Sequence, residues 1–431
     1  MTILDRIGTE YVDLVLTKHQ YHDIWDVYWL ADTIFWKREE LYVDRKNRTY
    51  PYKPAPKKAY MSLEEIIRDG EILKDEIKRY KKDFTGNDAI RADFLAEHLR
   101  SLIVKSKLLL GNRVPYDVFT DEMYSLVAPS FDDRKLREAC EELNAALPGK
   151  GNLIDKINAY KEKIRIPMEN VPTVINYMAK YFHETAVDNM RIKEECMPRL
   201  RYWHYGNDLD FVTVLFGYDY DVVNLEQNIN LDIPYYLDNI REIVGHELEP
   251  GHFTFMNLRT KGAIDFGYPE LGLNLHAPSS AFIEAGARLT VELALDTPEK
   301  EREFDEKSFE LAGVDKKYIE QLTIYRKFMR ISNYGKLEIE RNLWNNVWTE
   351  DQARTFAAEY AIDYKDILRF KKDAGHFTSH SYSTDILRKY YNMHCKTTEE
   401  KWKVYTSLCQ QPFSMKKIEN GTFDPFEFQA F

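Results

Sequence analysis

Apolar residues recur every three or four positions through most of the chain, a spacing that predicts amphipathic α-helices. Near the N-terminus Ile7, Tyr11 and Leu14 follow this spacing, in the first of two helices predicted over residues 5–42. Further helices are predicted over residues 63–111 (two long charged helices), 131–146, 152–165, about 173–197, and through most of the chain after 300. The pattern therefore predicts a mainly α protein.

Local signals mark where several of these helices begin and end. Ser62, with Glu65 three positions later, is typical of a capping box that starts a helix. Gly86 and Asn87 predict the turn between the two long charged helices. Prolines among basic residues predict a loop over residues 45–58.

Residues 211–218 and 222–225 have a different character. They are rich in β-branched and aromatic residues with turn residues between them, which predicts two strands. The edge of a small sheet could pair with an extended substrate backbone. A hairpin that only covers the core is the alternative.

The length of 431 residues suffices for two domains or for one large helical body with a cleft. We expect an N-terminal helical region over residues 1–165 and a second region over 166–431, a division that is also compatible with one continuous domain. With 44% hydrophobic and 30% charged residues, the composition is typical of a globular soluble protein.

Charge and cysteine content narrow the class of protein. A net charge of −11 and a pI near 5.6 argue against a general nucleic-acid binder, whose affinity depends on a basic surface. The four cysteines are scattered without a C-x-x-C pair, which is typical of reduced thiols in a cytosolic protein. The N-terminus lacks a signal pattern, and no apolar run approaches the ~20 residues of a membrane span. We therefore expect a cytoplasmic protein without nucleic-acid or membrane partners.

Candidate chemistry centres on His246, Glu247 and His252. Imidazole and carboxylate groups bind zinc at roughly 2.0–2.2 Å, and a His-Glu pair on a helix begins the metalloprotease pattern in which the Glu is the base. The two histidines are six positions apart, which on an unbroken helix places them roughly 240° apart. The Pro-Gly dipeptide between them favours a bulge or kink that would bring them together. Alternatively, the helix ends at Glu249 and His252 opens the next element.

A predicted helix over residues 279–292 supplies a third candidate ligand. Glu284 lies there among apolar and small residues, where a carboxylate normally has a cation or a hydrogen-bonding partner. Two histidines and a glutamate from a second helix form the thermolysin-type arrangement, with an open position for water. A salt bridge from Glu284 to Arg288 is the alternative. His276, in the loop 261–278, is a further candidate for a ligand or a substrate contact.

This pattern resembles a large family of helical zinc proteins that carry an H-E-x-x-P-G-H-H signature and are grouped with the gluzincin metallopeptidases. The resemblance is specific over roughly residues 220–295. It implies that His246 and His252 bind Zn²⁺ or another divalent metal. It also implies that Glu284 is the third ligand and Glu247 the general base. The implied fold is mainly α: a large helical body with a deep central cleft and a small β-sheet or hairpin next to the metal-binding helix.

The chain departs from the family pattern at several positions. Phe253 stands where the family has a second adjacent histidine, and Ala285 and Gly286 replace its Gly-Trp pair.

A late segment of the chain resembles the family's Gly-Gln-Ala-x-x-Tyr, and the resemblance extends less specifically to about residue 390. In residues 375–380 this match puts His376 in the Gln place and His380 in the Tyr place, whereas a two-residue shift puts Tyr382 there. His380 and Tyr382 are therefore candidates for transition-state stabilisation, and His376 is a candidate for substrate binding. A packed helix start capped by Ser379 is the alternative.

Three arginines complete the candidate substrate site. Arg326 and Arg330 share one helical face, and Arg388 follows the late histidines. The planar guanidinium suits a carboxylate such as a peptide C-terminus. A face of ordinary salt bridges is the alternative.

These features favour a zinc-dependent hydrolase, a metallopeptidase that cleaves small peptides by a metal-activated water. The same site would also suit a non-peptide amide hydrolase or a lyase. A helical protein with a structural metal site, which would need four protein ligands, is the alternative from a different class. The expected partner is a peptide or small amide substrate; the sequence does not indicate an oligomeric state.

Overall fold

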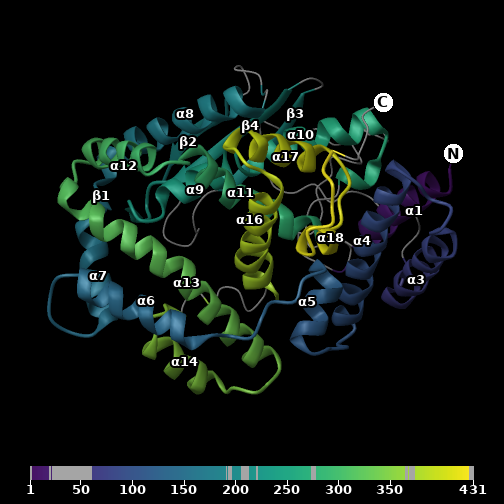
Figure 1. Ribbon diagram of the computed structural model, residues 1–431, viewed down its shortest axis with the longest axis horizontal. Helices are drawn as coiled ribbons and strands as arrows, with labels where there is room; N and C mark the ends of the chain where they lie inside the picture. Colours follow the sequence, from purple (N-terminus) through teal and green to yellow (C-terminus); the bar gives the residue numbers. More distant parts are fainter. Residues whose placement is uncertain are drawn as a thin grey trace. The chain divides into compact units, whose positions relative to one another are not determined.

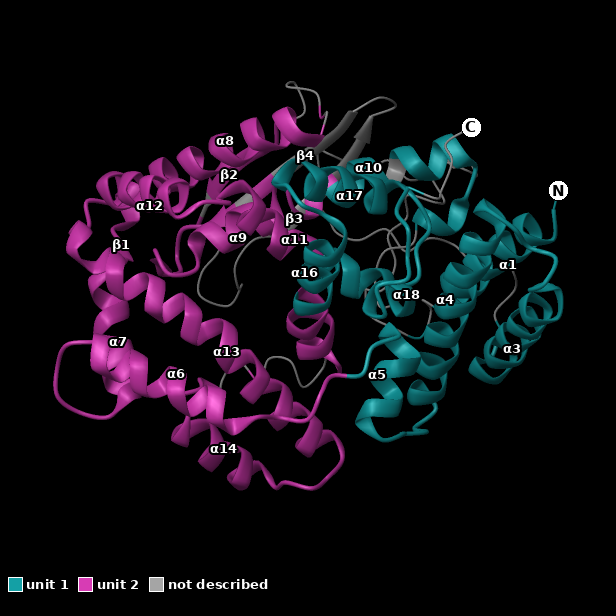
Figure 2. Cartoon of the chain, viewed as in Figure 1, with its two compact units in different colours: residues 1–127, 255–285, 385–431 teal, residues 128–254, 286–384 magenta. Residues whose placement is uncertain are grey.

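The computed structural model describes residues 2–18, 21, 61–190, 192, 197–204, 213–219, 222–272, 278–364, 367 and 374–426. Three predictions lie outside these residues: most of the second N-terminal helix, the loop 45–58, and His276. The backbone forms two compact units, drawn in teal and magenta in Figure 2. Unit 1 comprises residues 1–127, 255–285 and 385–431, and unit 2 comprises residues 128–254 and 286–384. Both units are discontinuous in the chain, whereas the division at residue 165 is a continuous one and stays a prediction.

Helices dominate the described residues, which confirms the mainly α prediction (Figure 1). Unit 1 holds α1 (Ile3–Lys18), α3 (Leu63–Tyr80), α4 (Asn87–Leu109), α5 (Tyr116–Tyr124), η6 (Pro269–Gly272), α17 (Thr398–Gln410) and α18 (Met415–Glu419). Unit 2 holds α6 (Asp133–Ala146), α7 (Leu153–Lys163), η4 (Met168–Asn170), α8 (Val171–Met190), α9 (Ile240–Glu247), α12 (Pro298–Ala312), η7 (Lys316–Tyr318), α13 (Ile319–Trp344), α14 (Glu350–Glu359) and the π-helical turn η8 (Thr378–Tyr382). Three helices have residues in both units: α10 (His252–Phe266), α11 (Pro278–Ala294) and α16 (Ser383–His394).

Two small sheets belong to unit 2. The predicted strand pair is confirmed as β3 (Thr213–Asp219) and β4 (Val222–Asn230), which run antiparallel. The structure adds β2 (Arg199–Trp203), parallel to β4, so the strand order is β2-β4-β3. A second, two-stranded sheet pairs β1 (Arg165–Ile166) with β5 (Tyr235–Tyr236). The predicted small sheet therefore precedes α9 in the chain, and the predicted deep central cleft stays a prediction.

Helix ends follow the local chemistry of the sequence. The Ser62 hydroxyl accepts a hydrogen bond from the Glu65 N–H at 3.1 Å, and the Glu65 carboxylate accepts one from the Ser62 N–H at 2.8 Å. This reciprocal pair is the predicted capping box, and it satisfies N–H groups that the first turn of α3 leaves open. Gly86 has a φ of 54° immediately before α4, a conformation that glycine adopts without a steric penalty.

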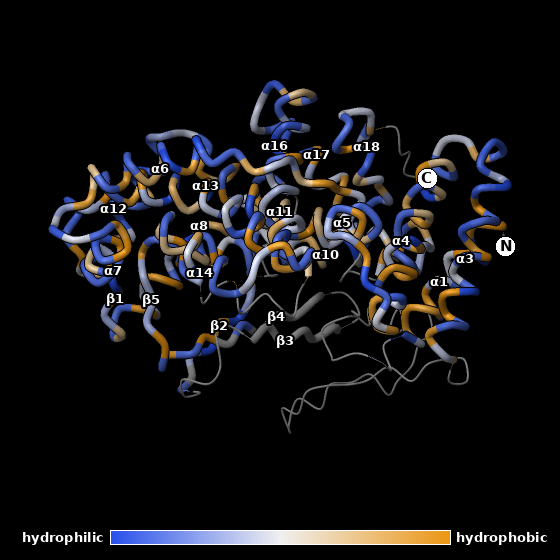
Figure 3. The backbone as a smooth tube through the Cα atoms, turned by 90° about the horizontal axis from the view of Figure 1, so that it is seen from below, coloured by the Kyte–Doolittle hydropathy of each residue, from blue (hydrophilic) through white to orange (hydrophobic). Residues whose placement is uncertain are grey.

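Both units bury apolar helix faces. Figure 3 shows hydrophobic and hydrophilic residues alternating along the helices. In unit 1, a Cβ at Gly70 of α3 would lie 3.1 Å from Ile103 of α4, so the two helices pack closely. In unit 2, α8 buries Val174, Met178 and Phe182 on one face. Among the described residues, none of the helices combines the length and apolarity that crossing a bilayer requires.

Candidate metal centre

A break in the helix brings two histidines together. Helix α9 ends at Glu247, Leu248 leaves the helical region with φ −94° and ψ −123°, and His252 begins α10. The alternative prediction was that the helix ends at Glu249 and that His252 opens the next element. The helix ends two residues earlier, at Glu247, and His252 does open the next helix. The rings nevertheless meet, because the centroids of His246 and His252 lie 4.3 Å apart with planes at 69°. The prediction that the Pro-Gly interruption brings the two imidazoles together is confirmed.

Glu247 joins these two histidines in one group. One ligand atom from each of His246, Glu247 and His252 lies within 4.8 Å of the other two, and all three side chains are half-buried. Imidazole nitrogen and carboxylate oxygen are donors that zinc prefers. The group can therefore hold a metal ion. Glu247 was predicted to be the general base and not a ligand, and its presence among the donors leaves both roles within reach.

Gly251 is required for the bend itself. A Cβ at this position would lie 2.0 Å from the carbonyl oxygen of His246 and 2.5 Å from that of Gly245. Contacts this short are never tolerated between non-bonded atoms, so the backbone can fold back over the last turn of α9 only where no side chain is present. After the bend the Phe253 N–H donates to the Leu248 carbonyl at 3.0 Å, which joins the start of α10 to the break.

Close helix packing fixes α9 just before the first histidine. A Cβ at Gly245 would lie 2.6 Å from Val291 of α11 and 3.2 Å from the ring of Phe182 of α8. Phe182 is fully buried. Because protein cores are close-packed, α9 has little freedom to shift at this point. Gly245 can be read from the sequence, whereas its contacts with Val291 and Phe182 follow only from tertiary packing.

A buried carboxylate lies within the bend, and the sequence reasoning missed it. Glu249 is 1% exposed, and its Oε2 accepts a hydrogen bond from Nδ1 of His183 of α8 at 2.5 Å. When the Glu249 carboxyl is ionised it only accepts, and Nδ1 of His183 is then the donor. Burial raises the pKa of the Glu249 carboxyl, and the hydrogen bond from His183 partly offsets this rise. The sequence signal that could have found it is a glutamate placed between two candidate ligands.

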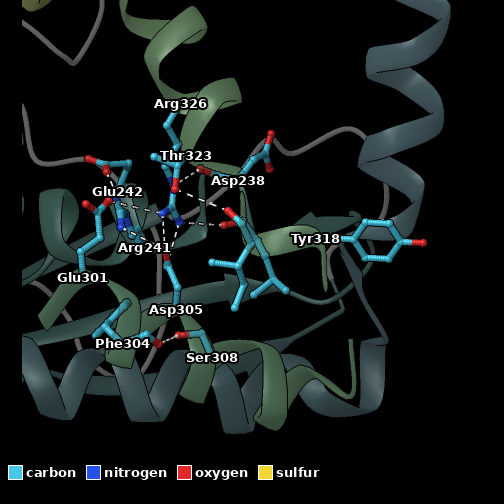
Figure 4. Close-up of polar contacts among 12 residues, drawn as sticks. Asp238, Arg241, Glu242, Glu301, Phe304, Asp305, Ser308, Tyr318, Thr323 and Arg326 are labelled. Atoms are coloured by element: carbon cyan, nitrogen blue, oxygen red, sulfur yellow. Dashed lines mark hydrogen bonds and ion pairs between the residues drawn. The ribbon is translucent and has the colours of Figure 1, made fainter. Parts of the chain in front are cut away.

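Ion pairs hold the start of α9 (Figure 4). The buried Arg241 lies 2.7 Å from Glu301 and 3.5 Å from Asp305. Arg326 of α13 donates two hydrogen bonds to Asp305, at 2.6 and 3.0 Å, and contacts the carbonyls of residues 237 and 238. The guanidinium of Arg326 thus takes part in a bidentate pair that links α13 to α12. Its predicted role in substrate binding stays a prediction.

Glu284, the predicted third ligand, lies on α11 and is half-buried. It belongs to unit 1, whereas His246 and His252 belong to unit 2. Glu284 is seven positions before Val291, and seven residues are close to two helical turns, so both lie on the same face of α11. Metal binding by Glu284 stays a prediction.

The late histidines form a second cluster in unit 2. The ring centroids of His376 and His380 lie 3.7 Å apart with planes at 30°. Nδ1 of His380 lies 2.9 Å from the Ser379 hydroxyl and 3.0 Å from the His376 carbonyl, which fixes the ring. Tyr382 is half-buried against a small apolar cluster with Phe377. The Ser383 N–H donates to the carbonyl of residue 378, the i to i+5 bond of a π-helical turn, and such turns occur frequently at functional sites.

The remaining predicted substrate residues lie on helix surfaces. Arg330 of α13 is exposed, and Arg388 of α16 forms an ion pair with Asp385 one turn earlier. Their roles, like those of His376, His380 and Tyr382, stay predictions.

We compared the chain with protein-family models, with curated proteins and with solved structures. None of the three comparisons gave a match.

Proposed function

We propose that this protein is a zinc-dependent hydrolase, and that its substrates are small peptides. The observation that carries the proposal is the group formed by His246, Glu247 and His252, in which three donor atoms lie within 4.8 Å of one another. Two imidazoles that can hold zinc, with a carboxylate beside them that can serve as the base, are the groups that a zinc hydrolase needs, and all three side chains are partly exposed. The resemblance to the H-E-x-x-P-G-H-H family supports the same assignment.

Each residue receives a role in this proposal. His246 and His252 would hold the metal from the two sides of the bend, and Glu284 is the candidate for the third ligand. Bound zinc supplies a water whose pKa is lowered toward about 7. Glu247 takes the proton from the attacking water and passes it to the leaving amine. A donor among His380 and Tyr382 stabilises the negative charge that develops on the substrate carbonyl oxygen, while His376, Arg326, Arg330 and Arg388 are the substrate-binding candidates.

Substitution of the proposed base is the sharpest test of these roles. Glu247→Gln keeps the size of the side chain but removes its basicity. We expect turnover to fall by about 100- to 10,000-fold, while the zinc dissociation constant stays within about threefold because the histidines still bind. Glu242→Gln on the same helix is the matched control, and it should change neither quantity. Full activity of Glu247→Gln would refute the assignment of the base.

One observation favours a second candidate function. Glu247 lies among the donor atoms themselves, which would suit a non-catalytic site in which it is a ligand. In that case Glu247→Gln would weaken zinc binding, and no turnover would be found for the wild-type protein. The same variant thus separates the two candidates.

The substrate class needs a separate experiment. The zinc-loaded protein is incubated with a peptide library, with and without a chelator, and products are read by mass spectrometry. We expect cleavage that the chelator abolishes and that added zinc restores. The position of the cut relative to the peptide ends then identifies aminopeptidase, carboxypeptidase or endopeptidase action. Hydrolysis of amides other than peptides, with peptides left intact, would contradict the peptidase assignment but not the metal site.

A further inference from the structure

The pair formed by His183 and Glu249 buries two polar side chains beside the bend. Their side chains are 5% and 1% exposed. Among the described residues Oε1 of Glu249 has no hydrogen-bond partner, so Oε2 carries the one bond that holds the carboxylate. Burying a carboxyl group with half of its acceptors unused costs stability. A glutamate at this position therefore does not serve stability alone.

The pair acts on the residues that lie between the two histidine ligands. Glu249 follows Glu247 by two positions and precedes His252 by three. A hydrogen bond to Glu249 thus restrains the short segment that sets the separation of the two imidazoles. Without it, that segment would be held by its backbone bond at Leu248 and by the packing of Gly251.

One helix contacts the chain on both sides of the His246–Glu247 pair. Phe182 of α8 packs against Gly245, immediately before it, and the next residue of α8, His183, binds Glu249, two positions after it. Both α8 side chains are buried. Two adjacent residues of a packed helix therefore act as a template that fixes the last turn of α9 and the first residues of the bend.

We propose that His183 and Glu249 are positioning residues that set the metal affinity of the His246–Glu247–His252 group. This inference rests on the proposed metal site. The two side chains do not touch the ion; they hold the bend in the geometry in which the imidazoles converge. Groups that orient a metal ligand by a direct hydrogen bond change metal affinity by about 10- to 100-fold when they are removed. We expect an effect of the same order from a pair that restrains the segment between the two histidines.

The test compares two substitutions of Glu249 by zinc titration. Glu249→Leu removes the acceptor for His183 and keeps a side chain of similar size, whereas Glu249→Gln retains an acceptor. We expect the leucine variant to bind zinc about 10- to 100-fold more weakly and the glutamine variant to stay within about threefold of wild type. This rescue by the conservative variant would not follow from a general loss of stability. Circular dichroism of the metal-free variants checks that both are folded.

A matched control separates positioning from simple destabilisation. Glu97 of α4, in unit 1, is also buried and accepts hydrogen bonds from Ser414 and Met415. Glu97→Leu should lower the free energy of unfolding and leave the zinc dissociation constant unchanged. His183→Leu removes the same contact from the α8 side, outside the ligand segment, and should weaken zinc binding as Glu249→Leu does.

The outcomes are distinct. Equal zinc affinity of folded Glu249→Leu and wild type would overturn the inference while leaving the proposed function in place. If Glu249→Leu does not fold, His183→Leu decides in the same way, and failure of both to fold assigns the pair to folding and overturns the inference. Wild-type protein that binds no zinc would instead refute the proposed function itself, so the wild type is measured first.

Discussion

The two histidine pairs of unit 2 differ in spacing and in geometry. His376 and His380 are four positions apart, and their rings stack at 3.7 Å with planes at 30°. His246 and His252 are six positions apart across a Pro-Gly break, and their rings meet at 4.3 Å with planes at 69°. Within the described part of the chain, His246 and His252 belong to a three-donor group although their spacing is the less favourable one.

A third donor makes this difference, because Glu247 lies beside His246 and His252. The angle between the ring planes also bears on whether two imidazoles can share an ion. Two nitrogens on a tetrahedral ion lie about 3.3 Å apart, with lone pairs that converge on the ion. Lone pairs lie in the ring planes, so two rings that lie face to face at a small angle direct them within nearly parallel planes, which do not meet close to the nitrogens. Rings that meet at a steep angle can converge. The comparison teaches that a helix break can bring two histidines into a possible metal-binding group although their spacing is not the regular four.

Removal of single imidazoles is expected to give the largest effect. His246→Ala or His252→Ala should weaken zinc binding by more than about 100-fold, since each removes a ligand. His376→Ala and His380→Ala should leave the affinity within about threefold of wild type, because among the described residues this pair does not belong to the three-donor group. For each variant, the zinc content is measured after dialysis and the zinc dissociation constant is measured by calorimetry. Loss of zinc from His376→Ala would reverse the comparison.

An alanine at the bend should weaken zinc binding less than the removal of an imidazole does, and it should also lower the stability of the protein. The Cβ of Gly251→Ala would collide with the carbonyl oxygens of His246 and Gly245. We expect a loss of about 3 kcal/mol in the free energy of unfolding, at the upper end for an inserted methyl group, together with weaker zinc binding. Urea denaturation of the metal-free protein gives the stability.

Gly86→Ala is the control for this substitution. An added Cβ at Gly86 would meet no atom within 4 Å, so only its positive φ opposes alanine. This should cost about 1–3 kcal/mol and leave zinc binding unchanged. Equal behaviour of the two variants would show that the close approach at residue 251 does not hold the bend.

The smallest effect is expected from substitution of Glu340, whose carboxylate binds the backbone just before and at the His376–His380 pair. The carboxylate of Glu340 accepts hydrogen bonds from the N–H groups of Gly375, His376 and Phe377 at 2.7, 3.2 and 3.3 Å. Glu340→Gln removes the charge that caps these groups, which should cost about 1–2 kcal/mol of stability. Zinc affinity should not change. A change in zinc affinity would connect the two histidine clusters and contradict their separate roles.

Local signals predicted much of the fold from the sequence. The helical spacing near the N-terminus, the capping box at Ser62 and the turn at Gly86 are confirmed by α1, α3 and α4. The strand pair β3–β4 is confirmed because its turn and composition are local too. Strand β2 was missed, since its five residues pair in parallel with β4 after an intervening segment, and sequence periodicity carries no information on such pairing. The helix predicted to run to about residue 197 ends at Met190 instead.

The candidate site was predictable where its residues are close in sequence. His246 and His252 flank a Pro-Gly break, so their approach followed from the chemistry of those two residues. The partner of Glu249 is 66 positions away, and only packing of α8 against α9 brings it near. Long-range contacts of this kind follow from tertiary structure and leave no periodic signal in one sequence. Zinc binding and catalysis by these residues stay predictions.

The account depends most on a metal bound at the bend of α9 and α10. Its most direct test is a crystal of the zinc-loaded protein, measured with X-rays on both sides of the zinc absorption edge. We predict one anomalous peak about 2 Å from a ring nitrogen of His246 and of His252. A peak at another position, or none at all in protein crystallised with zinc, would contradict the account.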